Sequence, residues 1–95
     1  MASLRRVESV YIGWVEISPA MAEKLQSKHG VTPDDVRDAC SFPIRPRWNN
    51  HPKHGYRLLL TGRTRHGTLL KVILQPVDVR DGTWRLRTAF PADGQ

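Results

Sequence analysis

Short apolar runs that alternate with polar residues dominate the second half of the chain. This period-two pattern is typical of half-buried strands. Turn-forming residues interrupt it at residues 65–67 and at Asp81-Gly82, a dipeptide favoured in hairpins. The pattern therefore predicts three strands, over residues 56–61, 68–75 and 83–90. A run rich in β-branched and aromatic residues predicts an earlier strand over residues 10–15.

Two helix starts lie between the first strand and the others. Ser18 and Thr32 are each followed by proline, so each offers a capping oxygen ahead of a residue suited to the first helical turn. The first helix should end at His29, because Gly30 suits the left-handed cap position. The second carries an apolar stripe at residues 36, 39 and 40 and should end at Phe42. The short connection between them predicts a helical hairpin.

This order of elements predicts an α+β fold, β-α-α-β-β-β(-β), in which the bracketed strand is optional. We expect a mostly antiparallel sheet with both helices on one face. The 95 residues fit a single domain over residues 1–95. Three prolines and two adjacent asparagines predict a loop over residues 43–55, with at most one short edge strand near residues 45–48. Residues 1–9 and 91–95 are expected to be flexible ends.

The basic residues are unevenly distributed. The chain has 15 Lys and Arg against 9 Asp and Glu, a formal net charge of +6. Residues 1–44 carry a net charge of −1 and residues 45–95 a net charge of +7. Folding does not require such an asymmetry, whereas binding to a phosphate-bearing partner favours it. The charge therefore indicates that the predicted sheet meets nucleic acid.

Several features bear on where the protein works. The apolar runs are too short to span a bilayer, and the chain does not open with a signal-peptide pattern. Cys40 is the single cysteine, so it cannot form an intrachain disulfide, and it is expected to be a small core residue. We therefore expect a soluble cytoplasmic protein with no membrane partner.

Five cations are candidates for a catalytic face. Alternation predicts that Arg85 and Arg87 share one face of the last strand, opposite Trp84, Leu86, Thr88 and Phe90. Three further cations are expected on the same face. They are Arg57, Arg63 and Lys71. Positioned cations can stabilise the charge that develops when a ribose 2′-hydroxyl attacks the adjacent phosphate. Charged residues on a solvated strand face would give the same pattern, and this alternative stays open.

The residues between 45 and 56 supply the remaining candidates. His54 and Tyr56 are the candidates for proton transfer. Four residues are expected to contact RNA. They are Arg45, Arg47, Trp48 and Lys53. Trp48 either stacks on a base or packs beneath the loop, and the two possibilities are equally weighted. His51 and His54 lack two further ligands for a closed zinc site, so neither a metal nor a cofactor is expected.

Three short segments follow the motifs of a known family in the same order and at similar spacing. They are Lys-His-Gly-Val-Thr at residues 28–32, Gly-Arg-Thr at residues 62–64 with the apolar run 69–74, and Arg-Leu-Arg-Thr-Ala at residues 85–89 before Pro91-Ala92. Together they resemble the helix hinge, central hairpin and closing strand of the BrnT toxin family. The resemblance extends over roughly residues 12–92.

The resemblance implies a RelE-like fold and a metal-independent endoribonuclease, the toxin of a bacterial type II toxin–antitoxin system that inhibits translation by cutting RNA. It also implies a cognate DNA-binding antitoxin, expected to be of the ribbon-helix-helix type. Phe90 stands where the family commonly has an Arg after the Ala. This departure favours an alternative, a degenerate toxin that binds nucleic acid or protein without cleaving RNA.

Overall fold

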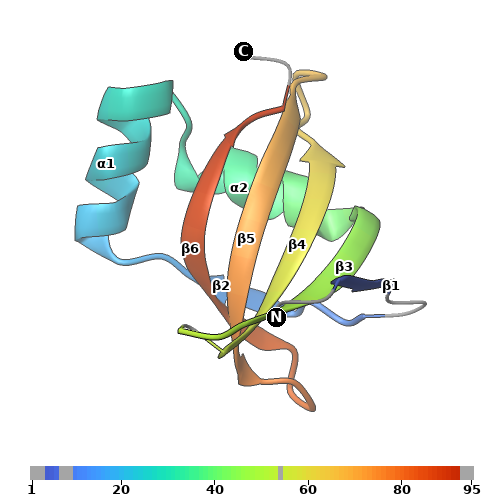
Figure 1. Cartoon of the computed structure of the whole chain (residues 1–95). Helices are drawn as coiled ribbons and strands as arrows, with labels where there is room; N and C mark the ends of the chain where they lie inside the picture. Colours follow the sequence, from blue (N-terminus) through green and yellow to red (C-terminus); the bar gives the residue numbers. More distant parts are fainter. Residues whose placement is uncertain (1–3, 7–9, 54, 93–95) are drawn as a thin grey trace.

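Within the described residues, six strands form one sheet and two helices cover one of its faces (Figure 1). The computed structural model describes residues 4–6, 10–53 and 55–92. The strands are β1 (Leu4–Arg6), β2 (Trp14–Glu16), β3 (Ile44–His51), β4 (Gly55–Arg63), β5 (Leu69–Asp78) and β6 (Thr83–Pro91). The helices are α1 (Pro19–His29) and α2 (Pro33–Ser41).

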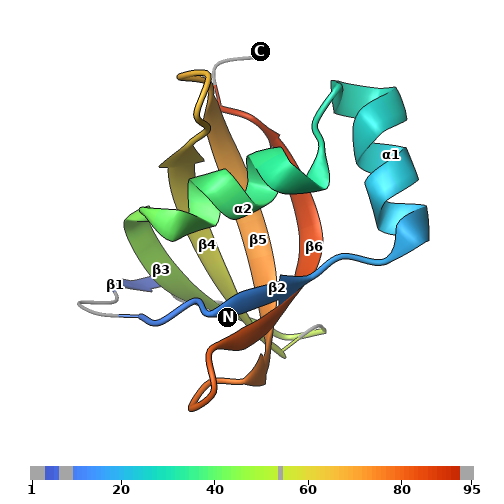
Figure 2. The same ribbon diagram turned by 180° about the vertical axis from the view of Figure 1, so that it is seen from behind.

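The sheet has the strand order β1-β3-β4-β5-β6-β2. Only the β2–β6 pairing is parallel, and the other four are antiparallel. Seen from behind, α2 crosses the sheet at β4 and β5, while α1 stands beside β6 (Figure 2). The predicted α+β class, the mostly antiparallel sheet and the placement of both helices on one face are confirmed.

The helix boundaries follow the predicted capping residues. The Ser18 hydroxyl accepts a hydrogen bond from the Met21 N–H at 3.1 Å, and Gly30 closes α1 with φ of 66°. Thr32 and Asp35 exchange hydrogen bonds of 3.0 and 3.1 Å, which is a capping box. Each helix therefore begins and ends through groups that are local in sequence.

The core lies between the helices and the inner sheet face. Its buried members from the sheet include Leu58, Leu60, Leu70, Val72, Leu74, Trp84, Leu86 and Ala89. Gly62 in β4 lies directly under α2, where an added Cβ would overlap the backbone of Ala39. Glycine is therefore required at this position, because a side chain would force the helix off the sheet.

The strand predicted over residues 10–15 is shorter in the structure, where it is β2. Strand pairing begins at Trp14 rather than residue 10, because the N–H groups of Gly13 and Trp14 both donate to the Gly82 carbonyl, at 2.7 and 2.9 Å. These bonds hold the approach to β2 against the β5–β6 turn. The Arg37 guanidinium of α2 donates to the Val15 carbonyl at 3.2 Å, so α2 also holds β2 in place.

The loop predicted over residues 43–55 is wrong, because β3 occupies Ile44–His51 and pairs with β4 on one side and β1 on the other. The prolines are accommodated without breaking the strand. Pro46 falls at a bulge in the β3–β4 ladder, where its missing N–H costs no ladder bond. Pro52 lies in the turn after β3. Pro46 and Pro52 therefore mark a bulge and a turn rather than a loop.

The chain ends differ from the prediction in part. β1 lies within the segment 1–9 that was expected to be flexible, and it pairs with β3. At the other end, Pro91 completes β6, and the Ala92 N–H donates to the Leu69 carbonyl at 2.8 Å. Pro91 and Ala92 therefore belong to the described fold, and the rest of the two predicted flexible ends, residues 1–3, 7–9 and 93–95, lies outside the described residues.

The alternation in β6 reverses at one residue. The β5–β6 register shifts at Arg87, which is an extra residue between two ladder pairs. Leu86 before the shift and Ala89 after it are both buried. Thr88 and Phe90 therefore lie on the face opposite the core, and the prediction that they share the face of Leu86 is wrong.

Candidate nucleic-acid interface

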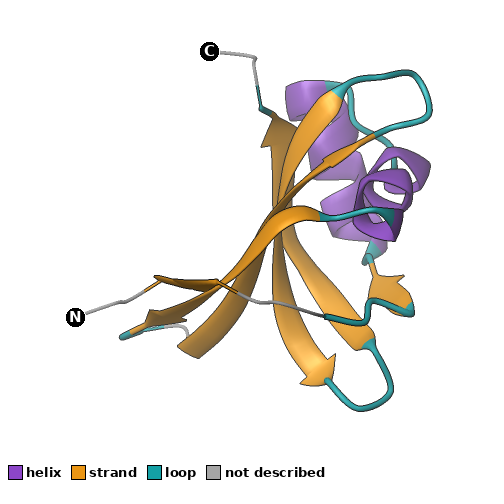
Figure 3. Ribbon diagram, turned by 90° about the vertical axis from the view of Figure 1, so that its right-hand side faces the viewer, coloured by secondary structure: helices purple, strands orange, loops and turns teal. Residues whose placement is uncertain are grey.

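The sheet face opposite the helices, here called the open face, is formed by β3, β4, β5 and β6. In side view the hairpin end of β3 and β4 bends away from the helices, which makes this face concave (Figure 3). Cross-strand partners share a face, so Arg47, Leu59, Ile73 and Thr88 form one row across the four strands. Side chains from distant parts of the sequence are thereby brought together on one surface.

A groove of about 310 Å³ lies in the open face. Three cations line it, Arg45, Arg47 and Lys71, all of them exposed. Three half-buried apolar side chains also line it. They are Leu59, Ile73 and Phe90. The groove therefore combines an apolar floor with a cationic rim.

The bulge in β3 brings two arginines to the groove. Ile44 pairs with Thr61 but Arg47 pairs with Leu59, so two residues of β3 stand opposite one residue of β4. These two residues, Arg45 and Pro46, form the bulge. Arg45 is the only non-glycine residue with positive φ among the described residues, at 52°. A left-handed backbone at such a residue costs roughly 1–2 kcal/mol. The strain is retained at the rim of the groove, where the bulge re-aims a cationic side chain.

Arg57 and Arg87 form a second cationic feature, here called the arginine pair. Arg57 is half-buried, and its Nε has no hydrogen-bond partner among the described residues. Desolvation, and then the charge of Arg87, lower the pKa of Arg57 below its ordinary value. Both guanidinium groups stay cationic at neutral pH. An anion held between them would supply the missing hydrogen-bond acceptor and relieve the repulsion.

Arg85 differs from the arginine pair because it has a counter-ion. Its Nη2 lies 3.3 Å from Glu16 Oε1, across the β2–β6 pairing. Both side chains are largely exposed, so the pair is weak. Glu16 nevertheless places a negative charge at this end of the open face.

Arg63 lies at the turn end of the open face. It shares the face of Leu59 and Thr61 by alternation along β4. Its Nη1 donates to the Gly67 carbonyl at 2.9 Å, which ties the side chain to the β4–β5 turn. The neighbouring Arg65 is bound to Asp38 of α2 at 3.0 Å. Arg63 is therefore on the predicted face, with its guanidinium held at the turn and at the opposite end of β4 from Arg57.

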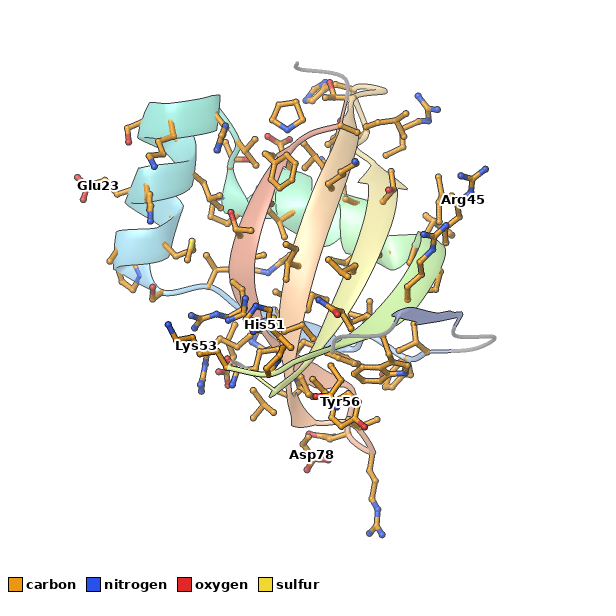
Figure 4. The ribbon with its side chains drawn as sticks, viewed as in Figure 1. Glu23, Arg45, His51, Lys53, Tyr56 and Asp78 are labelled. Carbon is orange, nitrogen blue, oxygen red and sulfur yellow. The ribbon has the colours of Figure 1, made fainter. Side chains whose placement is uncertain are left out.

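Trp48 and Tyr56 lie away from the groove. The Trp48 ring packs against the core, with its centroid 5.6 Å from that of Trp84 and 6.1 Å from that of Tyr56. Of the two possibilities for Trp48, the structure favours packing. Figure 4 shows Tyr56 well apart from His51 and Lys53. Tyr56 is thus not brought to the cations as a proton-transfer group, and His54 lies outside the described residues.

His51 is a site residue that the sequence indicated only as half of a possible metal motif. Its Nδ1 accepts a hydrogen bond from the Lys53 N–H at 3.0 Å. His51 and Lys53 lie in front of the sheet on its open side (Figure 4). Among the described residues, no group of three His, Cys, Asp or Glu is placed to hold a metal ion.

The apolar floor is the other feature that the sequence did not reveal. Leu59, Ile73 and Phe90 occupy positions at which a solvated strand face would carry polar residues. The only sequence signal is that the apolar runs in β4 and β5 lack full alternation. Continuous apolar runs also occur in strands buried on both faces, so that signal alone does not indicate a binding groove.

No helix in the described part of the chain is long and apolar enough to cross a membrane. Comparison of this chain with family models, with curated proteins and with solved structures finds no match.

Proposed function

We propose that this protein is an RNA-binding endoribonuclease that needs no metal ion, and that it is the toxin of a type II toxin–antitoxin system in the bacterial cytoplasm. The observation that carries the proposal is the concave open face with its arginine pair, in which Arg57 is half-buried, Arg87 is exposed and neither forms an ion pair with an acid among the described residues. The resemblance of the helix hinge, central hairpin and closing strand to BrnT toxins supports the same assignment.

The proposed reaction is an intramolecular transesterification. A ribose 2′-oxygen attacks the adjacent phosphorus and gives up its proton, while the bond to the 5′-oxygen breaks and that oxygen takes a proton. The products are a 2′,3′-cyclic phosphate and a 5′-hydroxyl. Arg57 and Arg87 stabilise the extra negative charge on the phosphorus oxygens. His54 is the candidate acceptor for the 2′-hydroxyl proton.

A second candidate function is RNA binding without cleavage. It is favoured by Phe90, which places a ring rather than a guanidinium in the groove, and by Arg85, whose charge is partly met by Glu16. Tyr56 also lies away from the cations, which removes one predicted proton-transfer group.

The test is incubation of the purified chain with a single-stranded RNA in the presence of EDTA, followed by analysis of the product ends. Cyclic phosphate ends that disappear in Arg57→Gln and Arg87→Gln, and persist in Arg80→Gln, support the nuclease. Arg80 is the matched control, because it is an exposed arginine in the β5–β6 turn. Intact RNA that is nevertheless bound supports the second candidate, and absence of binding contradicts both.

The antitoxin has a separate test. A partner that neutralises this toxin should cover the open face, and its contacting segment should be acidic. Co-expression with the product of an adjacent gene should then restore growth. The complex should protect the arginine pair, so that Arg87→Gln weakens the complex more than Arg80→Gln does.

A further inference from the structure

The groove of the open face has a composition that phosphate binding alone does not require. Phe90, Ile73 and Leu59 are half-buried there, on a sheet face with no helix over it. Exposing apolar surface to water is unfavourable, whereas a planar apolar ligand would cover it. The rim supplies the charge of Arg45, Arg47 and Lys71 within the same groove. A ligand that is flat and apolar in one part and anionic in another matches both.

The position of Phe90 makes its ring available as one wall of the groove. β2 pairs with β6 only as far as Arg85, so no strand of the described part of the chain lies on the outer side of the second half of β6. Phe90 lies in that half, opposite Lys71 in the ladder. The ring also stands 6.3 Å from the ring of His29 at the end of α1, at 44°. Packing against α1 and β5 therefore orients the Phe90 ring.

We propose that this groove is a single-nucleotide subsite for unpaired RNA, in which Phe90 stacks on one base while Arg45, Arg47 and Lys71 hold the flanking phosphates. The volume of about 310 Å³ lies at the lower end for small-ligand pockets, which suits one base with its ribose. Aromatic stacking beside backbone-binding cations is a general mode of single-strand recognition.

The subsite distinguishes unpaired RNA from a duplex. A base must leave its stack to reach Phe90, and bases in loops or single strands do so readily. A duplex presents mainly its phosphates to the rim. Thr61 of β4 is the ladder partner of Lys71, and Arg57 lies four positions from Thr61, about 13 Å along the strand. The subsite and the arginine pair therefore contact different nucleotides of one strand. The subsite rests on the proposed RNA-binding function and adds to it a preference for unpaired RNA.

The experiment compares binding of three ligands, a labelled single-stranded RNA, the same strand without bases, and the corresponding duplex. Phe90→Ala should lower the affinity for single-stranded RNA by roughly 5- to 150-fold, since stacking on one base is worth about 1–3 kcal/mol. Its affinities for the duplex and for the strand without bases should not change. Phe42→Ala is the matched control, because Phe42 is an 82% exposed phenylalanine at the end of α2.

Two conservative variants separate stacking from shape. Phe90→Trp keeps a stacking ring and should retain binding, whereas Phe90→Leu keeps apolar volume without a ring and should lose binding as Phe90→Ala does. Wild-type affinity for single-stranded RNA in Phe90→Leu would show that binding needs no aromatic ring at this position, which overturns the stacking subsite. If Phe90→Ala binds single-stranded RNA as tightly as the unmodified protein, and both bind in a salt-sensitive way, the subsite is overturned but the proposed function is not. No RNA binding by the unmodified protein would overturn the proposed function as well.

Discussion

Removing one member of the arginine pair should weaken RNA binding without weakening the fold. Arg57 and Arg87 lie on β4 and β6 with β5 between them, and Arg57 is level with Arg85 rather than with Arg87, so their backbones are more than about 9.5 Å apart at the usual strand spacing. Two like charges about 9.5 Å apart repel by roughly 0.4 kcal/mol in a water-like dielectric. Arg87→Gln removes this repulsion, so the free energy of unfolding should stay constant or rise by no more than that amount.

The same substitution should weaken RNA binding, and by a larger free energy than it changes the free energy of unfolding. A charge-assisted hydrogen bond to phosphate is worth about 1.5–3 kcal/mol, so each single variant should lose roughly 10- to 150-fold in affinity at low salt. Loss of one phosphate contact should also reduce the slope of log affinity against log salt by about 0.7 for a single strand. If both arginines hold one phosphate, the double variant should lose less than the sum of the two single losses.

The assay is titration of a labelled single-stranded RNA at several salt concentrations, with urea unfolding measured on the same samples. Arg80→Gln corrects for the general loss of one positive charge. Equal losses in Arg80→Gln and Arg87→Gln would refute the argument, because the effect would then come from net charge. Strictly additive losses would refute the shared phosphate, and a destabilised Arg87→Gln would show that the arginine supports the fold.

Three further predictions concern the ion pair, the core and the helix–sheet contact. Glu16→Gln should free Arg85 and tighten RNA binding, with a steeper salt dependence in the same titration. Burial raises the pKa of the Cys40 thiol to about 12, so thiol reagents at pH 8 should label it only in denaturant, and rapid native labelling would contradict its burial. Gly62→Ala should lower the free energy of unfolding by about 3 kcal/mol or more in urea titrations, since its Cβ meets the Ala39 backbone; a change under 1 kcal/mol would contradict the close contact.

The parts of the fold that the sequence predicts well are those fixed by local interactions. Ser18 and Thr32 cap their helices through groups three residues away, and Gly30 ends α1 through its own backbone conformation. The Asp81-Gly82 turn needs φ of 74° at the glycine, which the dipeptide itself accommodates. Such features depend on neighbouring residues, so they can be inferred before the fold is known.

The missed features depend on partners that are distant in sequence. β3 is a strand because β4 and β1 offer it hydrogen bonds on both sides, and this outweighs the prolines. The Arg63 guanidinium is held at the β4–β5 turn because the Gly67 carbonyl accepts its hydrogen bond. Glu16 meets Arg85 only because β2 pairs in parallel with the last strand of the chain. Tertiary pairing decides each of these outcomes, and alternation along one segment contains no information about it.

The register shift at Arg87 places Phe90 on the sheet face opposite to the one that strict alternation predicts. Strict alternation places Phe90 in the core, as an apolar residue where the BrnT pattern that the sequence resembles has an arginine. The shift places Ala89 in the core and Phe90 in the groove, beside Lys71. An aromatic ring and a guanidinium at this position face the same ligand, but the first meets a base and the second a phosphate. In the proposed subsite a phenylalanine stands where the BrnT pattern that the sequence resembles has an arginine, so a different part of the RNA is contacted, and the arginine pair remains to hold the phosphate.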